Sequence, residues 1–244
     1  MALIDTRPAA TAPARPRLLW SWTAWTTGGE AVGFCVPAAV ATLTFDLPVP
    51  VALPCLLLAG AVEGAVLGTA QAHVLRRVLP RLPARRWVAM TSAAAVLAWV
   101  IGLLPSLLGD RMSSWPAPIL VTAAAIGGAG LLLSIGTAQW TVLRRYVSQA
   151  GRWIAVTAIA WLAALAAFML IAPPLWHEGQ PPPVIIAIGI VAGLVMATTM
   201  AVVTGLGLEP LVRTARSNDR GIANGSGRQQ CVEGHEAVAE CSQT

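Results

Sequence analysis

Two acidic residues, Glu30 and Glu63, stand inside long apolar stretches of this chain. An ionised carboxylate in the middle of a membrane helix costs about 2.5–3.5 kcal/mol on insertion scales. Each side chain is therefore expected to be protonated, paired or facing water. Glu30 lies 12 residues after Leu18 (30 − 18), and Glu63 lies 12 residues before Leu75 (75 − 63), near the ends of the two apolar stretches that hold them.

If those stretches form an antiparallel helical hairpin, both carboxyls lie roughly 18 Å from one membrane face, at about 1.5 Å per residue. The two side chains can then be level and adjacent, and like charges so placed favour a single proton shared by the pair. One interpretation is a proton, cation or substrate site. The other is structural, with a protonated Glu donating to a carbonyl of a neighbouring helix. The sequence leaves both open.

The other residues with chemical potential form no catalytic pattern. His73 is expected at a membrane interface, His177 and Glu178 in a loop, and Cys231, His235 and Cys241 in a spacing unlike tetrahedral zinc sites. The chain has no Walker-type loop, no dinucleotide fingerprint, no His-Glu-x-x-His and no Gly-x-Ser-x-Gly. We therefore expect no metal, no cofactor and no enzymatic activity.

Composition indicates a membrane protein. The chain has 244 residues, of which 56% are hydrophobic and 11% charged, and soluble domains carry about 25% charged residues. A bilayer core needs about 20 apolar residues per helix. Six runs satisfy this: 18–44, 49–75, 87–108, 117–143, 153–172 and 184–208. The fold class predicted is an all-α integral membrane protein with six transmembrane helices.

The basic residues give the orientation. All 16 are Arg, and all but Arg111 lie before the first run, between the second and third, between the fourth and fifth, or after the sixth. The positive-inside rule then places both termini in the cytoplasm, in a multi-pass inner-membrane protein. The partners expected are the lipid bilayer and anionic lipids at the cytoplasmic face, not nucleic acid. The first run is expected to be a retained helix rather than a signal peptide.

Three segments follow from these runs. Residues 18–208 form the membrane domain. Residues 1–17 and 209–244 are polar, without helical periodicity, and are expected to be disordered cytoplasmic ends.

Within the membrane domain one motif occurs twice. "GTAQAHVLRR" covers residues 68–77 and "GTAQWTVLRR" covers residues 136–145, 68 residues later (136 − 68), and "ATTM" from Ala197 resembles a faded third copy. Trp20, Trp87 and Trp153 open the odd-numbered runs at a similar spacing, where indoles favour the headgroup level. The pattern predicts three parallel hairpin repeats, about 18–77, 87–145 and 153–208, around an axis along the membrane normal.

The residues of this motif are those that pack helices together. Small residues four apart let helix backbones approach closely in lipid. The candidates are Gly60, Gly64, Gly68, Gly128, Gly136, Gly189 and Gly193. Gln71 and Gln139 can bond a neighbouring backbone or line a vestibule, and both roles stay open. The anchors expected at the cytoplasmic exit are Arg76, Arg77, Arg144 and Arg145.

The motif resembles that of a group of bacterial multi-pass membrane proteins of uncharacterised activity. These have a Trp near the start of one helix and Gly-x-x-Gln-Trp-x-x-Leu-Arg-Arg at the end of the next. Here the full form is Gly136, Gln139, Trp140, Leu143, Arg144 and Arg145. The first copy has Ala72 in place of Trp, and the third keeps neither Gln nor the Arg pair. The resemblance covers the six-helix part and implies no functional residue.

Two functions fit these observations. One is a small-solute or proton-linked transporter or channel that uses Glu30 and Glu63. The alternative is a non-transporting membrane scaffold or accessory subunit that binds partner helices or anionic lipid. The two carboxyls separate these hypotheses, because only the first requires them for flux.

Overall fold

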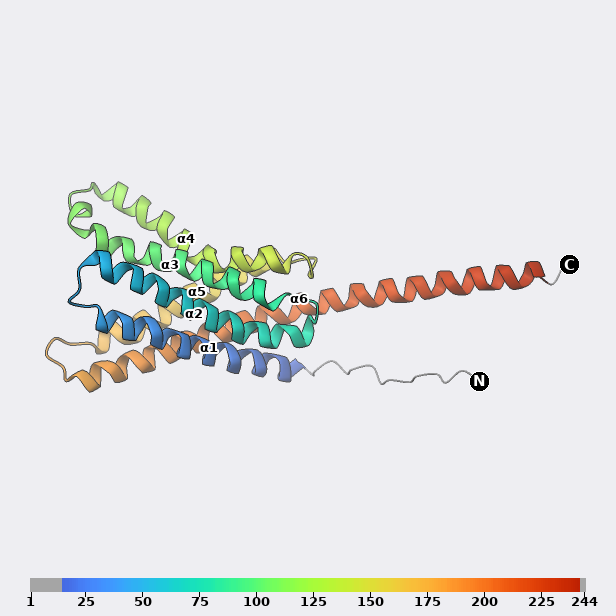
Figure 1. Cartoon of the computed structure of the whole chain (residues 1–244), viewed down its shortest axis with the longest axis horizontal. Helices are drawn as coiled ribbons and strands as arrows, with labels where there is room; N and C mark the ends of the chain where they lie inside the picture. Colours follow the sequence, from blue (N-terminus) through green and yellow to red (C-terminus); the bar gives the residue numbers. More distant parts are fainter. Residues whose placement is uncertain (1–14, 242–244) are drawn as a thin grey trace.

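The computed structural model describes the backbone of residues 15–241 and the side chains of residues 17–213. Within that range the chain folds into six α-helices joined by short connections (Figure 1). They are α1 (Arg15–Leu43), α2 (Val49–Val78), α3 (Ala84–Met112), α4 (Ala117–Leu143), α5 (Arg152–Leu175) and α6 (Pro182–Cys241). The ends predicted to be disordered, 1–17 and 209–244, lie largely outside the described side chains.

Each predicted run coincides with one of these helices, and the largest difference is at the end of α6. The run was predicted to end at Leu208, yet the helix continues, and Leu211 and Val212 are each only 2% exposed. Both belong to the same apolar core as Leu208. The core therefore extends at least four residues past Leu208, because apolar residues one turn further along still reach it.

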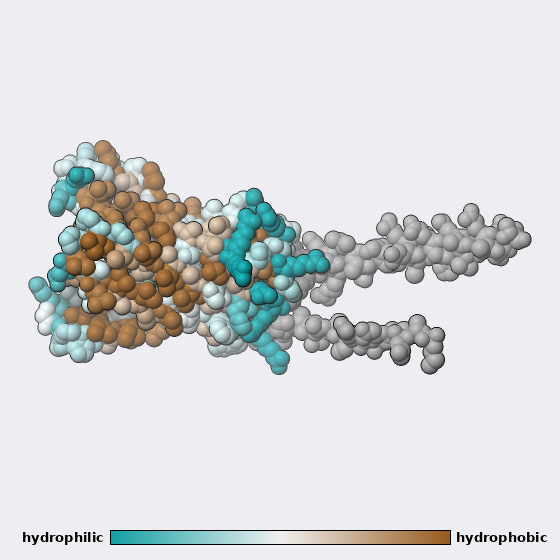
Figure 2. Space-filling model, in the orientation of Figure 1, coloured by the Kyte–Doolittle hydropathy of each residue, from teal (hydrophilic) through white to brown (hydrophobic). Residues whose placement is uncertain are grey.

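Five helices of the described chain, α2 to α5 and α6 over Pro182–Arg213, are long and apolar enough to cross a membrane. The helix α1 is not among these five. It carries polar residues at its centre, among them Thr26, Thr27 and Glu30. Many large apolar side chains are exposed, and Figure 2 shows them covering most of the visible face, with a hydrophilic band at the end near the termini. The helices are compatible with a multi-pass membrane protein.

The six helices form a closed ring. Each packs on the helices before and after it, and α6 packs on α1. The loops after α1, α3 and α5 lie at one end, and the start of α1 and the connections after α2 and α4 lie at the other, the arginine end (Figure 1). Buried residues stop at Ala95 in α3 and begin only at Ile135 in α4. The three hairpins therefore pack tightly at the arginine end and separate toward the loops.

Three tryptophans form the centre of the arginine-end core. Trp22, Trp87 and Trp153 are completely buried, and the ring of Trp153 lies 5.9 Å from that of Trp22 and 6.4 Å from that of Trp87. We expected Trp20 in this set and all three indoles at the headgroup level. Trp20 does not belong to this set, since it is 72% exposed and Trp22 takes its place, and Trp87 and Trp153 are core residues because the six helices converge here.

The tryptophans also correct the register between the hairpins. Trp22, Trp87 and Trp153 are 65 and 66 residues apart (87 − 22 and 153 − 87), and each is followed four residues later by a buried threonine: Thr26, Thr91 and Thr157. In the even helices the corresponding buried leucines are Leu75, Leu143 and Leu208. The third counterpart of "GTAQ" is therefore "AVVT" from Ala201, not "ATTM" from Ala197.

Four of the predicted packing glycines lie against a neighbouring helix. A Cβ built on Gly64 would lie 2.8 Å from Ser92 Cα, and one on Gly68 would lie 3.1 Å from Val88 Cα, so α2 and α3 touch through their backbones. Gly136 approaches α5 in the same way, and Gly60 lies under the Trp99 ring. Gly128, Gly189 and Gly193 do not pack within the chain, since a Cβ there meets nothing within 4 Å where the hairpins separate.

Candidate functional site

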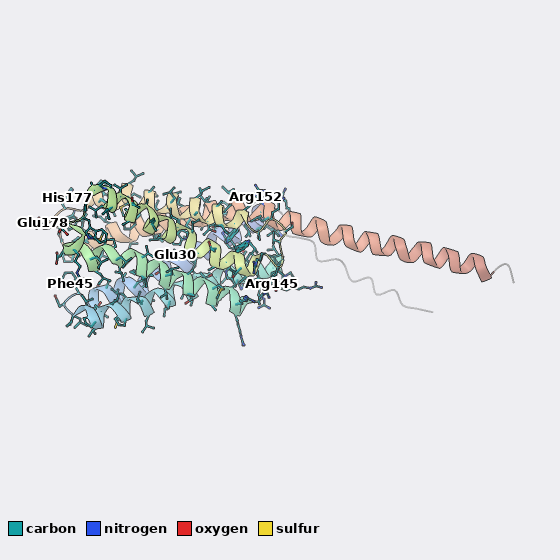
Figure 3. All side chains as sticks on the ribbon, turned by 90° about the horizontal axis from the view of Figure 1, so that it is seen from above. Glu30, Phe45, Arg145, Arg152, His177 and Glu178 are labelled. Atoms are coloured by element: carbon teal, nitrogen blue, oxygen red, sulfur yellow. The ribbon has the colours of Figure 1, made fainter. Side chains whose placement is uncertain are left out.

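A cavity of about 300 Å³ lies inside the ring, and all six helices line it. Its walls are mostly apolar and aromatic, with Phe34, Trp99 and Trp161 among them. Its two carboxyls are those of Glu30 and Glu63, from α1 and α2. Glu30 lies midway along the bundle, between Arg145 and Arg152 at one end and the loop residues Phe45, His177 and Glu178 at the other (Figure 3). The structure therefore brings the two predicted carboxyls to one place.

Positions that correspond in the three hairpins all line this cavity. Eight residues after each core tryptophan stand Glu30, Ala95 and Trp161. The corresponding positions of the even helices hold Glu63, Leu131 and Met196. Counting from Trp20 instead of Trp22 would give Leu97 and Ala163 as the counterparts of Glu30, two residues too far along each helix. Only the first hairpin places acids at these positions.

Glu30 is the more enclosed of the two acids. Its side chain is 1% exposed, and neither carboxyl oxygen has a hydrogen-bond partner among the described residues. The backbones of α1 and α2 approach closely beside it, since a Cβ on Gly33 would lie 3.1 Å from the carbonyl oxygen of Glu63. An unpaired buried carboxyl is costly, so this group is expected to hold a proton or a bound partner.

Glu63 is held by a tryptophan from α3. It is 8% exposed, and Trp99 Nε1 donates a hydrogen bond of 2.7 Å to Glu63 Oε2. The indole fits there because Gly60, one turn before Glu63, has no side chain, and a Cβ on it would overlap the Trp99 ring. Sequence reasoning missed Trp99 as a site residue, because the two partners lie 36 residues apart on different helices.

No basic residue lines the cavity among the described residues. The two carboxyls therefore have no countercharge from the protein, and both cannot remain ionised in apolar surroundings without one. A proton or a small cation would supply the missing charge. The aromatic walls suit a cation with an apolar body, because aromatic faces attract positive charge.

Gln71 and Gln139 lie away from the cavity, in a buried polar cluster at the arginine end. Gln139 Nε2 donates to Gln71 Oε1 at 2.7 Å and to Thr91 Oγ1 at 3.0 Å, and Trp153 Nε1 donates to Gln139 Oε1 at 2.9 Å. Both glutamines are at most 2% exposed. Of the two roles left open for them, packing between helices is the one that this geometry shows, since buried amides with partners do not face a vestibule.

The cavity is closed toward the arginine end. Each core tryptophan precedes the cavity-lining residue of its helix by eight residues, about 12 Å along the helix axis. The tryptophans, the leucines packed on them and the glutamine cluster fill that interval. Toward the loops the hairpins separate, since buried residues stop at Ala95 in α3 and begin only at Ile135 in α4.

The remaining candidates lie at the surface or outside the described residues. All four predicted arginine anchors are exposed at the arginine end. Arg144 lies over the Trp140 ring at 4.8 Å, and Arg77 contacts Ser21 and His73. No cluster of His, Cys, Asp or Glu suited to a metal ion occurs among the described side chains, and Cys231, His235 and Cys241 lie beyond them.

Comparison with protein-family models, with curated proteins and with solved structures finds no match to this chain. The resemblance to a bacterial membrane-protein group therefore stays a prediction. What the fold and the site define is a class: an all-α protein whose helices are compatible with multi-pass membrane insertion, with an acidic pair in an internal cavity.

Proposed function

We propose that the chain spans the inner membrane six times, as three parallel hairpins, with both termini in the cytoplasm. The closed ring supports α1 as the sixth span, because α1 fills the place between α2 and α6. Its polar residues Thr26 and Glu30 are buried, while Trp25 and Val32 are exposed, so lipid would meet an apolar face. The orientation rests on the arginine distribution.

Within that architecture, we propose that the protein is a proton-linked transporter of a small solute that binds at Glu30 and Glu63. The observation that carries the proposal is the buried, unpartnered carboxyl of Glu30 beside a second acid in a cavity without basic residues. The solute class that fits is a small organic cation with an apolar or aromatic body. Such a cation and a proton each neutralise the negative charge of the same acidic pair, so binding of one displaces the other.

Transport additionally requires the arginine end to open. The contacts that would have to separate are those among Trp22, Trp87 and Trp153 and those of the glutamine cluster. The hairpins are the natural moving bodies, since each is joined to the next by a short connection at that end. A site that faces one side and then the other converts the exchange of proton and cation into coupled flux.

The test begins with binding. Benzyltrimethylammonium is titrated into the purified full chain by calorimetry, with benzenesulfonate as an anionic control of similar size. Glu30→Gln and Glu63→Gln should each weaken binding of the cation by about tenfold, the equivalent of ~1.4 kcal/mol. Glu178→Gln is the matched control, because Glu178 is an exposed loop acid. Equal affinity in all variants would exclude the acidic pair as the site.

Flux then separates transport from binding alone. In proteoliposomes with a pH-sensitive dye inside, addition of the cation outside should release protons in the wild type and not in Glu63→Gln. The alternative function, a membrane scaffold or accessory subunit, predicts no flux in either. The hydrogen bond from Trp99 to Glu63 is the observation that favours a structural role for that acid.

A further inference from the structure

A second depression, the α1/α2 groove, lies on the outer face of the first hairpin. It has a volume of about 740 Å³ and is lined by α1 and α2 alone, over residues 24–32 and 62–73. Its lining is almost entirely apolar and rich in small residues. It is separate from the central cavity, with which it shares no lining residue.

Small residues create the groove. A Cβ on Gly29 would lie 2.6 Å from Ala70 Cβ, so the two helices touch at the floor. Gly28 is exposed, and a Cβ there would meet nothing within 4 Å, so the space above it is open. Trp25, Val32 and Val62, each about half exposed or more, form the rims. In a bilayer such a surface faces lipid.

One end of the groove is cationic and rich in hydrogen-bond donors. The Trp25 and His73 rings contact each other with centroids 4.4 Å apart. One turn beyond His73, Arg77 donates to His73 Nε2 at 2.6 Å and to Ser21 Oγ at 3.2 Å. No carboxylate among the described residues pairs with Arg77, and its guanidinium is exposed at the arginine end. This end suits an anion at headgroup level.

The length of the groove matches one leaflet. From Val62 to His73 is 11 residues of α2 (73 − 62), or about 16 Å, against about 15 Å for half of a hydrocarbon core of ~30 Å. A partner helix crosses both leaflets and would need a groove that continues along the whole hairpin. A single lipid of the arginine-end leaflet needs only this length, with its headgroup at the cationic end.

We propose that the α1/α2 groove binds one anionic phospholipid of the arginine-end leaflet. The phosphate accepts hydrogen bonds from Arg77 and the nearby donors, and one acyl chain lies over Gly28 between Trp25 and Val62. The site is independent of the transport function and holds whichever side of the membrane the arginines face. A lipid clamped there ties α1 to α2 on the side opposite their contact with the central cavity.

The experiment uses the full chain in detergent, titrated with phosphatidylglycerol or phosphatidylcholine and read by native mass spectrometry. The wild type should retain one phosphatidylglycerol in preference to phosphatidylcholine, whereas inorganic phosphate should not compete at matched concentration. Arg77→Gln should weaken that preference by about fivefold, the value for one arginine near the surface. Arg145→Gln, another exposed arginine at the same end, is the matched control and should retain it.

Gly28→Leu tests the acyl chain separately. The side chain fills open space, so the protein should fold, as checked by its elution volume and helix content, and lose the bound lipid. Three outcomes overturn the proposal: equal losses in Arg77→Gln and Arg145→Gln, retention of the lipid in a folded Gly28→Leu variant, or a dimer cross-linked through Ala24→Cys. The first indicates diffuse charge attraction, and the last a second copy in the groove.

Discussion

Trp99 Nε1 lies 2.7 Å from Glu63 Oε2, and this hydrogen bond joins α3 to α2 inside the central cavity. Among the described residues, no other side chain donates a hydrogen bond to Glu30 or Glu63. Glu63 is thereby fixed in orientation, whereas Glu30 faces the cavity without a partner. In the proposed transporter the two acids would consequently have different roles: Glu63 is positioned by the protein, and Glu30 would be the group that meets a proton or a cation.

Replacing Trp99 by Phe should weaken both the fold and the site. The substitution keeps an aromatic wall but removes the donor, and hydrogen bonds between membrane helices contribute about 0.6–1.7 kcal/mol. We expect a loss of stability of that size in detergent, together with weaker binding of benzyltrimethylammonium. Trp161→Phe, in the same cavity and without a recorded hydrogen bond, should change stability less. Equal effects of the two variants would mean that only ring volume matters.

Replacing Gly60 by Ala should act through Trp99. The new Cβ overlaps the indole, so the ring has to move, and overpacking of this kind costs about 1–3 kcal/mol. We expect a lower thermal midpoint and the same loss of cation binding as in Trp99→Phe. Gly102→Ala is the control, because Gly102 lines the same cavity with nothing within 4 Å of its Cβ. Normal binding in Gly60→Ala would show that the indole is not needed at that position.

Replacing Gln139 by Leu should loosen the arginine end. The change leaves Gln71 Oε1 and Trp153 Nε1 buried without the partners that Gln139 supplies, at a cost of about 1–3 kcal/mol. Hydrogen exchange should rise in α4 and α5 near that end. Gln149→Leu, at an exposed position in the following connection, should leave both stability and exchange unchanged. If the two variants behave alike, the cluster contributes nothing to closure.

The helices could be predicted closely because their signals are local. Apolar length and the Arg, Pro and Trp residues at the ends of each run define where a span begins and ends. The difference at the end of α6 arises because burial of Leu211 depends on the other helices and not on its own segment. The convergence of Glu30 and Glu63 was also predictable, since both are level in one hairpin.

The rotation of each helix could not be predicted in this way. Trp20, Trp22 and Trp25 all stand near the start of α1, and only packing selects Trp22 for the core. Because the prediction started from Trp20, its register for the first hairpin was shifted by two residues. The correspondence of Glu30 with Ala95 and Trp161 was therefore not recognised. The Trp99 partner was hidden for the same reason, because its direction depends on how α3 turns against α2.

The orientation can be tested by labelling single cysteines. In a variant with the native cysteines replaced by Ser, Ser114→Cys lies in the exposed loop after α3, and Ser148→Cys lies in the exposed connection after α4. A maleimide that cannot cross membranes should label the first in intact cells and the second only after permeabilisation. The reverse pattern would invert the topology, and labelling of both in intact cells would contradict a membrane-spanning α4 between them.

The two carboxyls can be tested as a unit through Glu30→Gln, Glu63→Gln and the double variant. Residues that share one site interact, and coupling in a double-mutant cycle of stability then exceeds about 0.5 kcal/mol. We expect such coupling because both side chains line one cavity. Removing one acid leaves the other without its partner in the shared site, so the effect of the double variant should differ from the sum of the two single effects. Thermal unfolding of the purified chain gives the four free energies. Strict additivity would mean that the carboxyls act separately, and a single exchangeable proton or cation between them would no longer be supported.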